Sequence, residues 1–167
     1  MGGGIHRAAD LSDCGTYRYA LWRTWDPLKE AVLFVGLNPS TADAERDDPT
    51  IRKCVKFARS WGYGEIVMCN LFAFRATDPR ELAKASARHG VDVVGPENED
   101  YLGDQAEQAA LVVAAWGNNP AALNRAPLVL PLLGPDVRCL GTTQDGHPRH
   151  PLYVRGETRP QPYRGCV

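Results

Sequence analysis

Asn38 stands between a glycine and a proline, a setting in which its side chain could do chemistry. It lies in the hexad Gly36-Leu37-Asn38-Pro39-Ser40-Thr41, directly after an apolar run. The amide offers an acceptor and two donors at one point of a tight turn, so its oxygen could orient a water molecule. The alternative is an ordinary turn, because asparagine, proline and serine are common turn residues.

Asn70 is a second candidate, at the end of another apolar run. An amide at that place can match the donor and acceptor edge of a nucleobase, while Phe72 or Phe74 could stack on the face of the ring. The alternative carries equal weight: both phenylalanines belong to the core, and Asn70 satisfies backbone groups.

Two histidines, each followed by a proline, give the third candidate in the segment Gly146 to Tyr153. Such a loop is stiff, and an imidazole from His147 or His150 could stabilise negative charge that grows on a departing base. Arg149 and Tyr153 of the same loop could enter a duplex or touch its backbone as the base flips out.

The apolar runs before these segments predict buried strands at 31–35, 65–70, 111–116 and 137–140. Asp48 and Pro49 begin an amphipathic helix to residue 61, and a capping box at 78–81 begins another over about 79–88. A third helix is expected at about 96–110, and a short helical segment from 119 that Pro127 and Pro131 interrupt. Strands that alternate with helices predict an α/β fold with a mostly parallel sheet, whose polar strand ends share one ligand-binding edge.

The N-terminal part predicts an antiparallel edge. Residues 17–25 alternate in a two-residue period, and a turn at 26–29 predicts a hairpin into strand 31–35. We expect residues 1–16 to be a loose N-terminal arm and residues 17–167 to be a single α/β domain.

The composition of the chain excludes several classes of protein. A chain of 167 residues with 44% hydrophobic and 23% charged residues is sized for one globular domain. No apolar stretch reaches the roughly 18 residues that span a bilayer, and no secretion signal opens the chain, so we expect a cytoplasmic monomer without membrane contact. The five cysteines form no CxxC pair, so we expect no metal and no cofactor. The net charge of -1 argues against broad attraction to nucleic acid, so any phosphate contact must be local.

A long acidic loop with Asp43, Glu45, Asp47 and Asp48 separates the first candidate from the helix at 49–61. Compact domains rarely keep such a loop without a function. If these aspartates line the pocket, they repel phosphate and could bind a sugar hydroxyl or a divalent ion. If they only cap a helix, a DNA substrate remains possible.

Taken together, these segments resemble the uracil-DNA glycosylase superfamily. Gly36-Leu37-Asn38-Pro39-Ser40 is similar to its first motif, in the Asn form of the mismatch-specific branch. The stretch 70–75 with Asp78-Pro79 is similar to the region after strand two of the thermophile-type branch. His150-Pro151-Leu152 resembles the third motif, with His147-Pro148 as a competing alignment. The resemblance implies a three-layer αβα fold with a central, mostly parallel four-stranded sheet plus an N-terminal edge strand.

Three departures from that superfamily change the expected chemistry. The chain lacks the four cysteines of the cluster-bearing branches, and no Asp stands at the position of Asn38, so strong general-base activation of water is not expected. Leu152 or Arg149 replaces the usual small residue after the proline of the third motif, which weakens the expected grip on DNA phosphates.

A closer resemblance, to domain-of-unknown-function family 1643, covers the chain from Tyr17 to Tyr153. It rests on Tyr17-Arg18-Tyr19, 36–43, 48–52, Asn70-Leu71-Phe72 and 150–153. This family supplies a fold expectation and no assigned reaction.

The leading hypothesis is a DNA glycosylase-like hydrolase that cleaves the N-glycosidic bond of a damaged or modified base. Asn38 would place the water, Asn70 would read the base, and His150 would stabilise the leaving base. The remaining expected site residues bind the substrate, in part through backbone amides near a phosphate: Gly36, Pro39, Ser40, Thr41, Phe72, Phe74, Arg75, His147, Arg149 and Tyr153. The alternatives are a non-catalytic nucleotide or modified-base binding protein and a hydrolase of free nucleosides. A nucleophilic Cys139 is a weaker alternative, since it would be buried in a strand.

Overall fold

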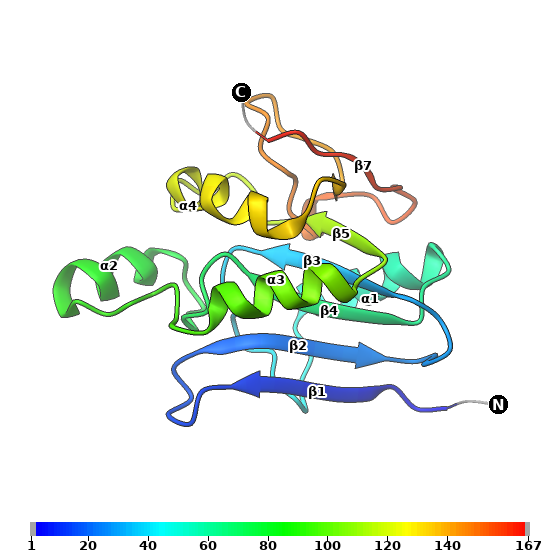
Figure 1. Cartoon of the computed structure of the whole chain (residues 1–167), viewed down its shortest axis with the longest axis horizontal. Helices are drawn as coiled ribbons and strands as arrows, with labels where there is room; N and C mark the ends of the chain where they lie inside the picture. The colour runs from blue at the N-terminus through cyan, green and yellow to red at the C-terminus, as the bar shows by residue number, and fades with distance from the viewer. Residues whose placement is uncertain (1–2, 166–167) are drawn as a thin grey trace.

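One mixed sheet organises the chain in the computed structural model, which describes residues 3–165 (Figure 1). Its seven strands stand in the order β1-β2-β4-β3-β5-β6-β7. The bounds are β1 His6–Leu11, β2 Arg18–Thr24, β3 Ala31–Gly36, β4 Glu65–Asn70, β5 Leu111–Ala114, β6 Val137–Cys139 and β7 Gln161–Pro162. Neighbours among β4, β3, β5 and β6 run parallel, whereas β1, β2 and β7 pair in antiparallel fashion.

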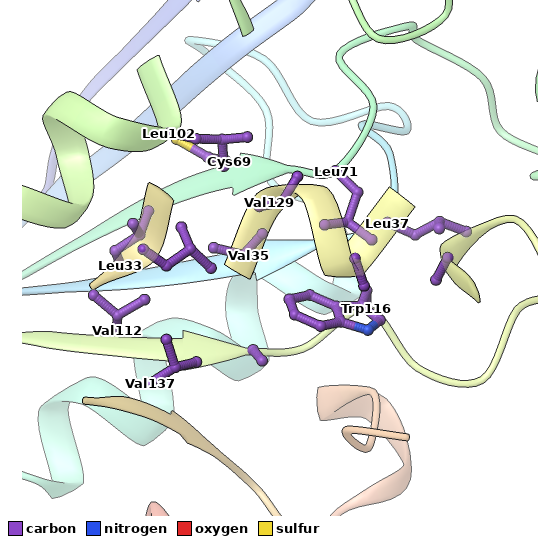
Figure 2. Packing of buried hydrophobic residues seen from close by; sticks show 14 of the residues in the cluster. Leu33, Val35, Leu37, Cys69, Leu71, Leu102, Val112, Trp116, Val129 and Val137 are labelled. Carbon is purple, nitrogen blue, oxygen red and sulfur yellow. The ribbon is translucent and has the colours of Figure 1, made fainter. Parts of the chain in front are cut away.

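Both faces of this sheet are covered by helices. Leu33 and Val35 face α2 (Arg80–His89), α3 (Asn98–Gln108) and α4 (Ala122–Val129), and Figure 2 shows this cluster with Leu102 and Val129 packed over the strands. Val32 and Phe34 face α1 (Pro49–Ser60) on the other side. Double coverage explains why the four residues 32–35 are fully buried, and why the sequence shows them as one uninterrupted apolar run.

The expected α/β class with a mostly parallel sheet is confirmed, but the strand count is larger. The sheet has seven strands, not four with one edge strand. Residues 6–11, expected within a loose arm, form β1 along the whole of β2. Residues 1–2 and 166–167 of the expected arm and domain lie outside the described residues.

The predicted strand at 17–25 is present as β2, but it pairs with β4, so the expected hairpin with β3 is wrong. Gly64 makes this possible at the sheet corner. Its carbonyl accepts from the N–H groups of Trp25 and Asp26, and its own N–H donates to Glu30. A Cβ at Gly64 would lie 2.0 Å from the Asp26 carbonyl oxygen, so only glycine lets β4 enter between β2 and β3.

The helices agree with the sequence prediction except at two prolines and one cap. Asp48 caps α1 as expected. Pro127, expected to interrupt, lies inside α4, and Pro131 lies in the first turn of η1 (Leu130–Leu133), where a missing N–H costs nothing. Before α2, Asp78 accepts from the Arg80 N–H, so the expected capping box does not form. None of the described helices is long and apolar enough to cross a bilayer.

Candidate functional site

A cavity of about 400 Å³ lies at the carboxyl end of the parallel strands. Its walls come from the loop after β3, the end of β4, the loop after β5, the start of α1 and η2 (Pro151–Tyr153). The neighbours β3 and β5 are followed by helices on opposite faces of the sheet, α1 after β3 and α4 after β5. Their loops therefore diverge and leave a crevice, which is where folds of this kind bind ligands.

Asn70 ends β4 and lines this cavity with a side chain that is only 3% exposed. Its Nδ2 is buried and has no hydrogen-bond partner among the described residues. Its Oδ1 lies against Gly36, where a Cβ would come within 2.7 Å of it. The backbone at this point is fixed from behind, because the Asn98 side chain donates to the carbonyls of Asn70 and Leu71 at 3.0 and 3.2 Å. Asn70 is thus a rigidly placed amide with free hydrogen-bonding capacity.

Asn38 also lines the cavity, and its amide orientation is fixed. Nδ2 donates to the carbonyl of Ala76 at 2.8 Å and to that of Pro39 at 3.1 Å. Both hydrogens of the amide nitrogen are used, so only the side-chain oxygen is left to accept a hydrogen bond.

His150 lines the same cavity, at the N-terminus of η2. Its Nδ1 accepts from the Leu152 N–H at 3.2 Å, so the neutral ring carries its proton on Nε2. Burial lowers the pKa of His150, and the charge of Asp48 only partly opposes this shift. The ring is therefore a neutral donor at physiological pH.

The structure brings Asn38, Asn70 and His150 together around one cavity, and His147 lies outside it. Gly36, Ser40 and Tyr153 also line the cavity. Ser40 further borders an open depression, to which Thr41 and Arg75 belong. The side chains of Pro39 and Arg149 line neither, and the Arg149 Nε donates to the Thr142 carbonyl at 3.1 Å.

The expected stacking by Phe72 or Phe74 is wrong for this cavity, since neither lines it. Phe72 is 9% exposed within the core on the α2 and α3 side, and Phe74 packs against the same cluster. The cause is backbone pairing beyond β4. The N–H of Phe72 donates to the Leu37 carbonyl and that of Phe74 to the Val93 carbonyl. The aromatic side chains that do line the cavity are Trp116 and Tyr153.

Arg18 is a cavity residue that the sequence analysis did not select. It is the first residue of β2, and because β2 runs antiparallel to β4, the start of β2 lies at the edge where the parallel strands end. The side chain is buried, and burial lowers the pKa of its guanidinium to about 10, which leaves it charged at neutral pH. The sequence feature that could have identified Arg18 is a charged residue between two tyrosines, Tyr17 and Tyr19, at the start of a strand.

The acidic loop both caps a helix and lines the cavity, the two alternatives that the sequence left open. Asp48 accepts from the Ile51 N–H at 2.9 Å as the cap of α1, and it also lines the cavity. Asp43 accepts from the N–H groups of Glu45 and Arg46, and Asp47 pairs with the buried Arg23 at 2.7 Å. Within residues 3–165, no three His, Cys, Asp or Glu side chains are grouped as metal ligands.

Cys139 is buried in β6, and burial raises the pKa of its thiol. Such a thiol is a poor nucleophile.

Comparison with known proteins gives one match. A family model described as protein of unknown function (DUF1643) matches residues 18–152. No curated protein and no solved structure matches the chain.

Proposed function

Because the chain belongs to the DUF1643 family, whose description assigns no reaction, we propose a function from the cavity itself. We infer an N-glycosidic hydrolase that removes a damaged or modified base from DNA, akin to the uracil-DNA glycosylase superfamily. In this proposal the protein works as a cytoplasmic monomer and needs no cofactor.

One observation carries the proposal: the amide of Asn70 is buried and unpartnered in the wall of a cavity that Asn38 and His150 also line. A buried polar group without a partner costs free energy unless a ligand supplies the missing hydrogen bond. A nucleobase edge alternates donors and acceptors and suits an amide. The volume of about 400 Å³ lies in the range of small-molecule sites.

Asn38 and Asp48 supply the part of the site that would meet water and sugar. The fixed Asn38 oxygen accepts a hydrogen bond from the attacking water. Cleavage of an N-glycosidic bond passes through an oxocarbenium-like sugar, and the Asp48 carboxylate stabilises that positive charge. The carboxylate also accepts the proton that the water loses.

His150 acts on the leaving base. Its Nε2–H donates to a base oxygen on which negative charge develops as the bond to the sugar breaks. A neutral donor suits this role, because it keeps its proton and needs no reorganisation.

The mouth of the cavity favours a polymer over a small molecule. Leu152 is 44% exposed and Tyr153 is 82% exposed, and both line the cavity. Exposed cations follow on α1, which packs beside η2, and on the segment after η2: Arg52, Lys56, Arg59, Arg155 and Arg159. In the described part of the chain none of them forms an ion pair, but Arg59 stacks on Trp25 and Arg52 donates to the Asp47 carbonyl, which leaves Lys56, Arg155 and Arg159 to meet phosphates.

Asp48 favours a second candidate, a hydrolase of free nucleosides. A carboxylate in the cavity repels a nearby phosphate but can accept from a sugar hydroxyl. If neither substrate is cut, binding of nucleotides or modified bases without hydrolysis remains.

The test is an incubation with oligonucleotides that carry a panel of deaminated and modified bases, followed by alkali to reveal abasic sites. Matching free nucleosides form a second arm, read by release of the base. We expect Asn38→Ala and His150→Ala to lower the cleavage rate at least 100-fold. His147→Ala is the matched control, because His147 stands in the same loop outside the cavity.

Two results would contradict the proposal. One is that no oligonucleotide in the panel is cut. The other is that His147→Ala and His150→Ala lower the rate equally.

A further inference from the structure

Three arginines are buried within residues 3–165, and one of these three has no carboxylate within ion-pair distance. Arg23 donates to Asp47 at 2.7 Å, and Arg125 donates to Glu99 at 2.7 Å. Arg18 is 2% exposed and makes no ion pair with any described residue. Of the three, only Arg18 lines the cavity.

The guanidinium of Arg18 is also poor in hydrogen bonds. Nη1 donates to the Ala42 carbonyl at 2.7 Å, and Nε is buried with no partner in the described residues. Arginine has five N–H donors and normally uses several of them when it is buried. A buried charge without an ion-pair partner is costly, and the Asp48 carboxylate of the same cavity offsets only part of this cost, so a ligand acceptor at this point would relieve a further part.

Three donors of the cavity have no partner among the described residues, and the acceptors on its wall are the Asn38 oxygen and the Asp48 carboxylate. Arg18 offers Nε–H, Asn70 offers Nδ2–H, and His150 offers Nε2–H. The Asn38 nitrogen is consumed by backbone carbonyls. A ligand edge that carries oxo oxygens would satisfy these donors, whereas an exocyclic amino group placed against Arg18 and Asn70 would set donor against donor.

From this juxtaposition, and resting on the proposed function, we infer that Arg18 is the specificity-determining residue of the cavity. It selects bases with an oxo oxygen on the edge that faces β2 and β4. It also takes up the negative charge of the leaving base.

Hydrolysis in this cavity proceeds by attack of water on the sugar. The water oxygen forms a bond to the sugar C1′ while the bond from C1′ to the base nitrogen breaks. The electron pair of the broken bond stays on the base and spreads to its oxo oxygen beside Arg18. The water proton passes to Asp48, and the base later takes a proton from solvent.

The test compares free bases by isothermal titration calorimetry in two pairs, uracil with cytosine and hypoxanthine with adenine, whose members differ in the exocyclic group and in the protonation of the adjacent ring nitrogen. We expect the oxo member of each pair to bind at least 10-fold tighter. Arg18→Met should abolish that preference, and Arg18→Lys should keep part of it. Arg88→Met, at an exposed arginine at the end of α2, is the matched control and should keep the full preference.

A measurement on the unaltered protein covers the case in which Arg18→Met does not fold. The affinity for an acidic oxo base, 5-nitrouracil, is measured at pH values below and above the pKa of that base. We expect tighter binding of the anion, because Arg18 makes no ion pair and the Asp48 carboxylate of the same cavity only partly offsets its buried charge. An affinity that is constant or falls as the base ionises overturns the inference.

The outcomes separate the inference from the proposed function. Oligonucleotides that stay uncut, together with an oxo preference that Arg18→Met removes, overturn the hydrolase and support Arg18. Cleavage with an oxo preference that survives in Arg18→Met overturns the role of Arg18 alone. Inorganic phosphate that competes with every base, and stops competing in Arg18→Met, also overturns it, because Arg18 then binds a phosphate.

Discussion

Removal of the Asp47 carboxylate should destabilise the protein far more than a surface ion pair would. The Arg23 side chain beside it is fully buried, with Nε 2.7 Å from Asp47 Oδ1. Its other nitrogens donate to the carbonyls of Trp22, Asp43 and Arg46. Asp47→Ala leaves this guanidinium buried without a counter-charge, and breaking a buried pair in this way costs about 3–5 kcal/mol.

The lower end of that range applies, since three backbone carbonyls still accept from Arg23 and the Asp47 side chain is 17% exposed. We expect a loss of about 3 kcal/mol in the free energy of unfolding, measured by urea denaturation. With a slope of about 2 kcal/mol per M, the midpoint falls by about 1.5 M.

The matched control is Arg7→Ala, which removes the other partner of Asp47. Arg7 lies 3.4 Å from Asp47 and is 41% exposed, so its loss should cost less than about 1 kcal/mol. Equal effects of the two substitutions, or a loss below 1 kcal/mol for Asp47→Ala, would refute the reasoning.

Three further predictions concern the cavity and an exposed thiol. Gly36→Ala places a Cβ 2.7 Å from the Asn70 side-chain oxygen, so it should displace that short side chain. We expect the cleavage rate to fall at least 10-fold while the free energy of unfolding falls by only about 1 kcal/mol. An unchanged cleavage rate would contradict this prediction. Burial lowers the pKa of His150 below 6.5, so the cleavage rate should stay level down to about pH 6.5 and fall below it as the ring protonates; a rate that rises on protonation argues against a neutral donor. Hydrogen bonds with Ser12 and then Thr16 lower the pKa of the exposed Cys14 to about 7, so its alkylation by iodoacetamide, followed by peptide mass spectrometry, should be half-maximal near pH 7 and shift upward in Ser12→Ala. A midpoint near 9 in the unaltered protein would count against these hydrogen bonds.

The central strands could be predicted from the sequence because they are buried on both faces. Residues 31–35, 65–70 and 137–140 read as apolar runs and correspond to β3, β4 and β6. The outer strands carry no such signal. In β1 half of the residues are exposed and polar, and the strand forms because β2 offers a free edge for backbone pairing. β7 has two residues, one of them proline.

The same logic separates the cavity residues that were predicted from those that were not. Asn38, Asn70 and His150 follow strands or the last loop, so a parallel sheet places them at one edge. Arg18 reaches that edge from the start of a strand, because β2 is antiparallel to β4, and that pairing depends on contacts far apart in the chain. The phenylalanines failed as stacking residues because the backbone beyond β4 pairs with residues 93–94, which no local pattern records.

The cavity walls come from β2, β4, the loops after β3 and β5, and η2, segments spread over most of the chain. An occupant would therefore hold together segments that lie far apart in the sequence. Stabilisation by mass action depends only on occupancy and not on turnover. Thermal-shift screening of a compound library could consequently identify the natural occupant before any reaction has been observed.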